Sequence, residues 1–70
     1  MQLQIEIERE DDGRFLAAIP ALPGVMAYGA TRDEAVTRVK ALALHVIADE
    51  IEHGERSREV ADAIFAPLAA

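Results

Sequence analysis

The segment from Pro20 to Glu34, PALPGVMAYGATRDE, constrains the fold more than any other part of the chain. Pro23 sets φ for the second position of a β-turn, and Gly24 allows the positive φ that a type II turn needs at its third position. Val25 to Tyr28 is short and apolar and predicts a strand, which Gly29 is expected to end. A turn and a strand therefore stand immediately before the region where a helix begins.

A long helix is predicted from Arg32 to His53. Thr31 and Glu34 form a capping box, in which the Thr31 hydroxyl accepts from an N–H of the first turn and the Glu34 carboxylate is expected to accept from the Thr31 amide. Gly54 fits the C′ position that ends a helix. At about 100° per residue the apolar positions cover an arc of roughly 200°, about twice the stripe that covers a sheet. These positions are Ala35, Val36, Val39, Leu42, Ala43, Leu44, Val46, Ile47 and Ile51.

So wide an arc cannot be covered by one sheet, and we therefore expect a homo-oligomer, either a dimer or a tetramer. A domain of 70 residues often depends on such association. The chain has no cysteine, which excludes disulfides and thiolate metal sites and suits a reducing cytoplasm. The residues expected at the oligomer interface are Val36, Val39, Ala43, Leu44, Ile47 and Ile51.

The N-terminal residues predict two further strands. Met1 to Glu8 alternates apolar and polar side chains, which indicates one buried and one solvated face. Glu10 to Gly13 is a polar hairpin connection, and Arg14 to Ile19 is the second strand. The three strands together predict an antiparallel meander. Val60 to Leu68 is compatible with a strand or a helix, and we favour a short final strand because Pro67 would break a helix interior.

The balance of charge is acidic, with seven basic and thirteen acidic residues and a net charge of −6. Such a chain repels nucleic acid and attracts basic proteins. The N-terminus lacks the pattern of a signal peptide. Five carboxylates gather near the first hairpin and are interpreted as a site for a basic partner, although a solvated strand edge or an Mg²⁺ site are alternatives. They are Glu6, Glu8, Glu10, Asp11 and Asp12.

Candidate catalytic groups are few, and we expect no enzyme, cofactor or metal. Ser57 is the only serine and has no histidine fixed beside it. His45, Asp49 and His53 share one helix face at a spacing that can bind zinc or nickel, but polar neighbours make this face a solvated stripe. A metal-dependent hydrolase using these residues or the acidic cluster remains an alternative.

The motifs resemble those of the HicB-like antitoxins of bacterial toxin–antitoxin pairs. That family typically carries a D-G-x-[FY]-x-A-x-[IV]-P-x-L-P-G segment, then a short strand ending in Gly, then T-x-x-E-A at a helix start. Here Asp12 to Gly24 reads DGRFLAAIPALPG, Tyr28-Gly29 follows, and Thr31 to Ala35 reads TRDEA. The helix end, Ile51 to Glu55, is also similar, so the resemblance covers nearly all of the chain up to Glu55.

The resemblance implies a β-β-β-α-β fold of class α+β and a non-enzymatic, oligomeric protein. Its partner would be a small, basic HicA-type ribonuclease toxin, which the domain binds and blocks. Many members add a helix-turn-helix or ribbon-helix-helix segment that represses their own operon. Neither segment is recognisable here, so the resemblance is to a short form without direct DNA binding. A solitary homo-oligomeric scaffold or ligand-binding protein of the same fold is the alternative.

Overall fold

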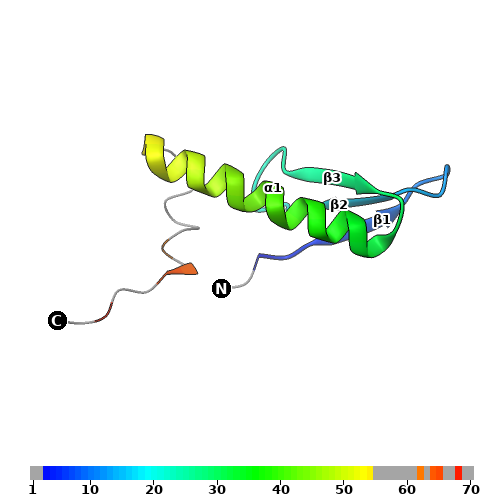
Figure 1. Ribbon diagram of the computed structural model, residues 1–70, viewed down its shortest axis with the longest axis horizontal. Coiled ribbons are helices and arrows are strands. Elements are labelled where there is room, and N and C mark those ends of the chain that lie inside the picture. The colour runs from blue at the N-terminus through cyan, green and yellow to red at the C-terminus, as the bar shows by residue number, and fades with distance from the viewer. Residues whose placement is uncertain (1–2, 55–61, 63, 66–67, 69–70) are drawn as a thin grey trace.

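The computed structural model describes residues 3–54, 62, 64–65 and 68. Three strands, β1 (Glu6–Arg9), β2 (Phe15–Ala18) and β3 (Met26–Gly29), form an antiparallel sheet in the order β1-β2-β3. One long helix, α1 (Arg32–His53), lies across one face of this sheet (Figure 1). The predicted α+β class is confirmed. The short final strand was predicted within Val60 to Leu68, most of which lies outside the described residues; Asp62 and Ile64, which are described, are helical.

The first hairpin has the polar connection that its residues predict. The Glu10 amide donates to the Arg14 carbonyl at 2.8 Å, and Gly13, at φ 89°, donates to the Glu10 carbonyl at 2.9 Å. The ladder with β2 starts at Glu6, which pairs with Ala18, so residues 3–5 of the predicted strand precede it, and residues 1–2 lie outside the described residues. In this register Pro20 would face Gln4, and it has no N–H to donate. The proline therefore limits the length of the ladder.

The second connection contains the expected turn. Val25 N–H donates to the Leu22 carbonyl at 3.0 Å, and Gly24 between them has φ 83°, as a type II turn requires. Because Val25 closes this turn, β3 begins one residue later than predicted. It also ends one residue later, since Gly29 pairs with Phe15 and is the last residue of the strand. The strand therefore ends at Gly29 as expected, although the glycine is itself the last paired residue.

Gly29 also allows the start of α1 to lie directly against the sheet. A Cβ at this position would overlap the backbone nitrogen of Ala35 and would lie 2.9 Å from both Ala35 Cα and the Glu34 carbonyl carbon. Real Cβ atoms do not approach backbone atoms so closely. A side chain could relieve the overlap by changing its rotamer, but backbone atoms cannot. Gly29 thus fixes the position of the helix start relative to β3.

The predicted helix bounds are confirmed. Thr31 Oγ1 accepts from the Glu34 amide at 3.1 Å, and Gly54 at φ 69° donates to the Ile51 carbonyl at 3.2 Å. One detail of the capping box was wrong, because Glu34 Oε1 accepts from the amide of Ala30 at 2.9 Å and not from that of Thr31. The carboxylate therefore anchors the residue that joins β3 to the cap.

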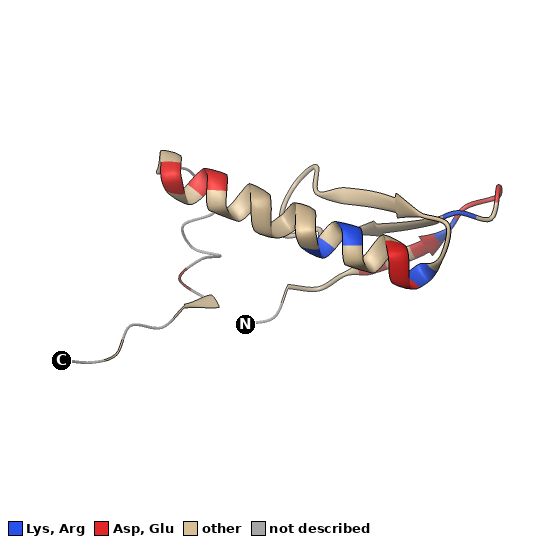
Figure 2. Ribbon diagram, in the orientation of Figure 1, with Lys and Arg blue, Asp and Glu red and all other residues tan. Residues whose placement is uncertain are grey.

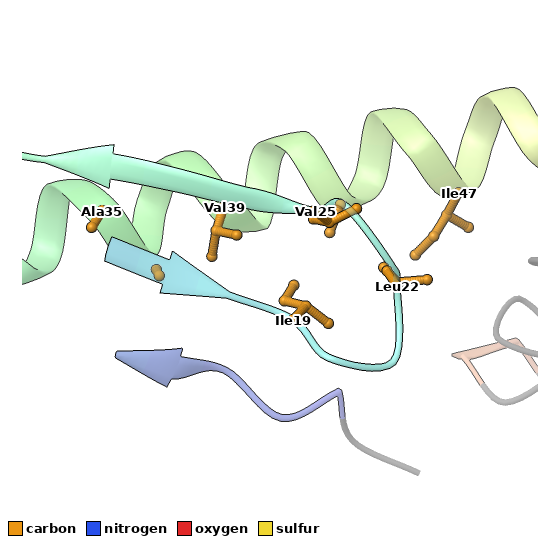
Figure 3. Packing of buried hydrophobic residues seen from close by; sticks show 8 residues of the cluster. Ile19, Leu22, Val25, Ala35, Val39 and Ile47 are labelled. Atoms are coloured by element: carbon orange, nitrogen blue, oxygen red, sulfur yellow. The ribbon is translucent and has the colours of Figure 1, made fainter. Parts of the chain in front are cut away.

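The core lies between α1 and the strands β2 and β3, on which the helix packs (Figure 3). Four core residues come from α1, at successive turns of one face. Three of them, Val39, Ala43 and Ile47, were expected at an oligomer interface, but they are buried within the core of this chain. The eight buried hydrophobic residues are Ala17, Ile19, Leu22, Val25, Ala35, Val39, Ala43 and Ile47.

Candidate protein-binding surface

The sheet has a second face, opposite α1, which no described element covers. The register places Glu6, Ala18 and Met26 in one cross-strand row. Glu8, Leu16 and Tyr28 form the next row on the same face. Side chains of alternate residues, such as Ile7 and Ala17, point to the helix side. The face that carries the two rows is called the open sheet face below, and it consists of Glu6, Glu8, Leu16, Ala18, Met26 and Tyr28.

The open sheet face is apolar over β2 and β3 and acidic along β1. Met26 is 50% exposed and Tyr28 is 41% exposed. Leu16 and Ala18 between the edges are half-buried, and with Glu6 and Glu8 they line a shallow depression. Exposed apolar side chains gathered beside charges are typical of protein-binding surfaces.

At the hairpin end of this face, Arg14 lies over the Tyr28 ring, with its guanidinium carbon 4.3 Å from the ring centroid. The Tyr28 hydroxyl lies 3.5 Å from Glu10 Oε1 and can donate to it. Arg14 also donates through Nε to Asp12 Oδ2 at 2.7 Å, and its backbone amide donates to Asp12 Oδ1 at 3.0 Å. Tyr28 is thus contacted at its ring by Arg14 and at its hydroxyl by Glu10.

The contacts with Arg14 change the acidity of Asp12. The backbone and side-chain hydrogen bonds from Arg14 lower the pKa of the Asp12 carboxyl, because they stabilise its charged form. The hydrogen bond with Asp12 in turn raises the pKa of Arg14. The pair therefore stays ionised, and its two charges largely offset each other.

The five carboxylates predicted as one partner site are thus divided by the structure. Glu6 and Glu8 lie exposed on the open sheet face, and the acidic colour along the β1 arrow is visible in Figure 2. Glu10 and Asp12 contact Tyr28 and Arg14 within the chain, and Asp11 is exposed at the hairpin tip. The acidic contribution to the face therefore comes mainly from the two glutamates of β1.

One of the two helix histidines contacts Asp49, which lies one turn before it on α1. His53 Nδ1 lies 2.7 Å from the Asp49 carbonyl oxygen and 3.4 Å from Asp49 Oδ1. His45 is exposed and lies one turn before Asp49. Within the part of the chain that the structure describes, no group of three His, Asp or Glu side chains is placed to hold a metal ion. The alternative of a metal site therefore gains no support from these residues.

Sequence reasoning missed the apolar half of the open sheet face. Met26 and Tyr28 were assigned to a strand, but the face to which they point depends on the register with β2. Their alternation with Ala27 was the available signal, since it places the two large side chains on one face. The cation–π contact of Arg14 with Tyr28 depends on the same register and joins residues that are far apart in the sequence.

None of the described helices is long and apolar enough to cross a membrane. The fold and the open sheet face define a small α+β domain in which a three-stranded antiparallel sheet carries one helix and leaves its other face available.

Two relatives share most of their length with this chain. A UPF0150 protein of Archaeoglobus fulgidus is 35% identical over 57 residues, which are 79% of this chain and 83% of the relative. A UPF0150 protein of Thermoplasma acidophilum is 30% identical over 56 residues, 80% of this chain and 81% of the relative. No family model matches the chain, and no solved structure matches it significantly. The chain belongs to the UPF0150 family of small proteins.

Proposed function

We propose that this protein is a non-enzymatic binding module of the antitoxin type, which pairs in the cytoplasm with a small, basic HicA-type ribonuclease toxin and inhibits it. The observation that carries the proposal is the open sheet face, where the exposed Glu6 and Glu8 stand beside the exposed Met26 and Tyr28. The net charge of −6 and the similarity of the DGRFLAAIPALPG and TRDEA segments to HicB-like antitoxins support the same partner.

Inhibition would follow because this protein and RNA compete for the same lysine and arginine side chains of the toxin. A ribonuclease holds the phosphates of RNA with lysine and arginine side chains. Glu6 and Glu8 are two residues apart in β1, so their carboxylates lie on the same side of the strand. Carboxylates that pair with the toxin's cations keep RNA phosphates away from them. Burial of Met26, Leu16 and the Tyr28 ring then supplies the affinity that screened surface charges lack.

In this proposal the charged and the apolar residues of the open sheet face have different roles in binding. Exposed charges mainly accelerate encounter, and salt screens this effect over about 8–10 Å. Met26 and Tyr28, which lose apolar area on binding, mainly slow dissociation. Arg14 supports binding indirectly, because it stacks on Tyr28 and holds the ring in place.

The proposal is tested by binding kinetics with a purified HicA-type toxin from the same genome. Replacing Glu6 and Glu8 together with glutamine is expected to slow association at low salt, and the difference from the natural protein should shrink as salt is raised. Asp33→Asn together with Asp62→Asn removes two exposed carboxylates outside the open sheet face and serves as the matched control. Equal slowing by both changes would mean that net charge acts without a local site. Unchanged kinetics in the double variant would remove the open sheet face from the binding site.

A solitary homo-oligomeric scaffold is the second candidate. It is favoured by the exposure of Leu44 and Ile51 on α1, which are 64% and 44% exposed. It predicts a stable assembly of this chain alone and no effect on RNA cleavage by the toxin. The toxin-binding experiment therefore separates the two candidates.

A further inference from the structure

We infer that the partner also binds the outer edge of β1, where one of its extended segments pairs with the backbone as a fourth strand of the sheet. This segment alternates basic and apolar residues. The inference rests on the proposed function for the source of the segment, and it adds the way in which the partner is held. The β1 edge, as it is called below, consists of the backbone N–H and C=O groups of Ile7 and Arg9.

The hydrogen-bond pattern of the sheet directs the backbone groups of Ile7 and Arg9 away from β2. In an antiparallel pair every second residue bonds with the neighbouring strand, and the residues between them direct their N–H and C=O groups outward. The Glu10 amide donates to the Arg14 carbonyl, so Glu10 and, two residues before it, Glu8 are the bonded positions. Within the part of the chain that the structure describes, no further strand pairs with β1 on its outer side.

The opposite edge of the sheet, on β3, is protected by the chain's own helix. Arg38 Nη1 donates to the Tyr28 carbonyl at 3.0 Å, and Gly29 at the end of β3 lies directly against the start of α1. The helix packs on β3 and β2, whereas β1, the blue strand in Figure 3, lies on the far side of β2. Cover by a helix is one of the ways in which proteins protect a strand edge, and α1 gives it to β3.

The side chains along the β1 edge differ between the two faces of the sheet. Glu6 and Glu8 are exposed on the open sheet face, whereas Ile5 and Ile7 are half-buried on the helix side. When an antiparallel strand is added at this edge, Glu6 and Glu8 take the non-hydrogen-bonded positions, where opposite Cα atoms are only about 4.5 Å apart. Opposite charges at such positions stabilise the pair. The added segment therefore carries lysine or arginine opposite the glutamates and apolar residues beside the isoleucines.

An apolar groove gives the apolar residues of the segment a place to be buried. The groove has a volume of about 250 Å³ and lies between α1 and the residues that precede β1. Its lining includes Leu3 and Ile5 on one side and Leu44 and Ile47 on the other. Ile5 belongs both to this groove and to the helix side of the edge, so a side chain of the added segment that points to the helix side lies next to the groove.

The charges of β1 select a basic partner over a second copy of this chain. Two β1 edges could pair antiparallel about a two-fold axis that passes through Glu6, Ile7 or Glu8. These three registers place Glu6 opposite Glu6, Glu6 opposite Glu8, and Glu8 opposite Glu8. Like charges directly opposite each other destabilise a strand pair, and charged side chains are a common protection against self-pairing. With a basic segment the same two carboxylates attract instead of repel.

Hydrogen exchange measured by NMR at each amide tests the β1 edge directly. In the free protein the outward amides of Ile7 and Arg9 are expected to exchange rapidly, whereas the amide of Glu8, which donates to β2, should exchange more slowly. Addition of a purified HicA-type toxin from the same genome should slow the exchange of Ile7 and Arg9, because their N–H groups then donate to the partner's backbone.

A proline substitution tests whether the outward N–H contributes to affinity. Arg9→Pro removes this N–H without removing a hydrogen bond to β2. Arg9→Ala is the matched control, since it removes the same side chain and keeps the N–H. The toxin is expected to bind Arg9→Pro about tenfold more weakly than Arg9→Ala, because a carbonyl of the partner loses its donor. Circular dichroism verifies that both variants are folded, and exchange in the natural protein decides the question if Arg9→Pro is not.

Two synthetic peptides separate this inference from the proposed function. In the first peptide lysine and valine alternate, so that a strand has all its lysines on one face. The second peptide has the same composition with the lysines in one block and the valines in another. The alternating peptide is expected to slow exchange at Ile7 and Arg9 more than the block peptide does, whether or not a toxin binds.

Three results would overturn the inference. The first is a toxin complex that forms while Ile7 and Arg9 still exchange rapidly, which would leave the proposed function intact. The second is slow exchange of both amides in the free protein, which would mean that another segment of this chain or a second copy already occupies the edge. The third is equal or absent protection by the two peptides when no toxin binds, in which case the proposed function fails as well.

Discussion

Replacement of Gly29 by alanine is expected to destabilise the domain strongly, although alanine is normally the better residue in a strand. The added methyl group would meet backbone atoms of Ala35 and the Glu34 carbonyl carbon, two of them at 2.9 Å. Overpacking of this kind costs about 1–3 kcal/mol, and the upper end applies because backbone must move. Alanine loses less conformational entropy on folding than glycine, which offsets roughly 0.5–1 kcal/mol of this cost. The net loss is therefore about 2 kcal/mol.

This loss is large for so small a domain, whose core usually supplies only about 3–5 kcal/mol. For a chain of this length, about 2 kcal/mol lowers the melting temperature by roughly 8–16 °C. Thermal and urea unfolding followed by circular dichroism measure both quantities. The reasoning would be refuted by a Gly29→Ala protein that melts at or above the temperature of the natural protein.

A matched pair of substitutions isolates the close approach from the loss of glycine itself. Gly13→Asn places a side chain at a hairpin position with φ 89° and no atom within 4 Å of the added Cβ. Asparagine tolerates this conformation, so the free energy of unfolding should change by less than about 1 kcal/mol. Gly29→Asn puts the same side chain against α1 and should leave the protein largely unfolded.

Three further changes test the cap, the core and the hairpin. Thr31→Ala removes the acceptor for the Glu34 amide and should lower the free energy of unfolding by about 1 kcal/mol, which Thr31→Ser should restore. Val39→Ala leaves a cavity at a fully buried position and should cost about 2–3 kcal/mol in urea unfolding, clearly more than Val36→Ala at a half-buried one. The lowered pKa of Asp12 stabilises the fold above the ordinary carboxyl pKa of about 4, and this contribution is lost as pH falls through the lower folded-state value. The melting temperature of Asp12→Asn should therefore lie below that of the natural protein at neutral pH and approach it below about pH 4.

The local features of the fold could be predicted from the sequence because local chemistry sets them. The helix begins after Thr31 and ends before Gly54 because a hydroxyl cap and a left-handed glycine are needed at those positions. The turn at Pro23 and Gly24 follows from the φ values that these two residues adopt. Such features depend on neighbours within four residues, all of which are visible in the sequence.

The errors concern contacts between distant residues. The width of the apolar arc of α1 was evident, but periodicity does not say which part the chain's own sheet covers. Val39 and Ile47 were therefore assigned to an oligomer interface, although both are buried in the core of the chain itself. The strand end at Gly29 was predicted, but the physical reason for a glycine there was not, since its close approach to Ala35 is visible only once the helix is docked.

The candidate site was predicted in part. Glu6 and Glu8 were identified from the alternation of the first strand, but Met26 and Tyr28 were not, because their place on the same face depends on two registers. Arg14 was treated as an ordinary strand residue, and its contacts with Asp12 and Tyr28 depend on the geometry of the hairpin. Pairing of strands thus determines the site, and single-sequence patterns specify pairing poorly.

The most direct test of the central claim is RNA cleavage by a HicA-type toxin from the same genome, measured while this protein is added. We expect cleavage to stop at an equimolar ratio, and Met26→Glu to require a clear excess for the same effect. Cleavage that continues at full rate with the natural protein in large excess would contradict the antitoxin function.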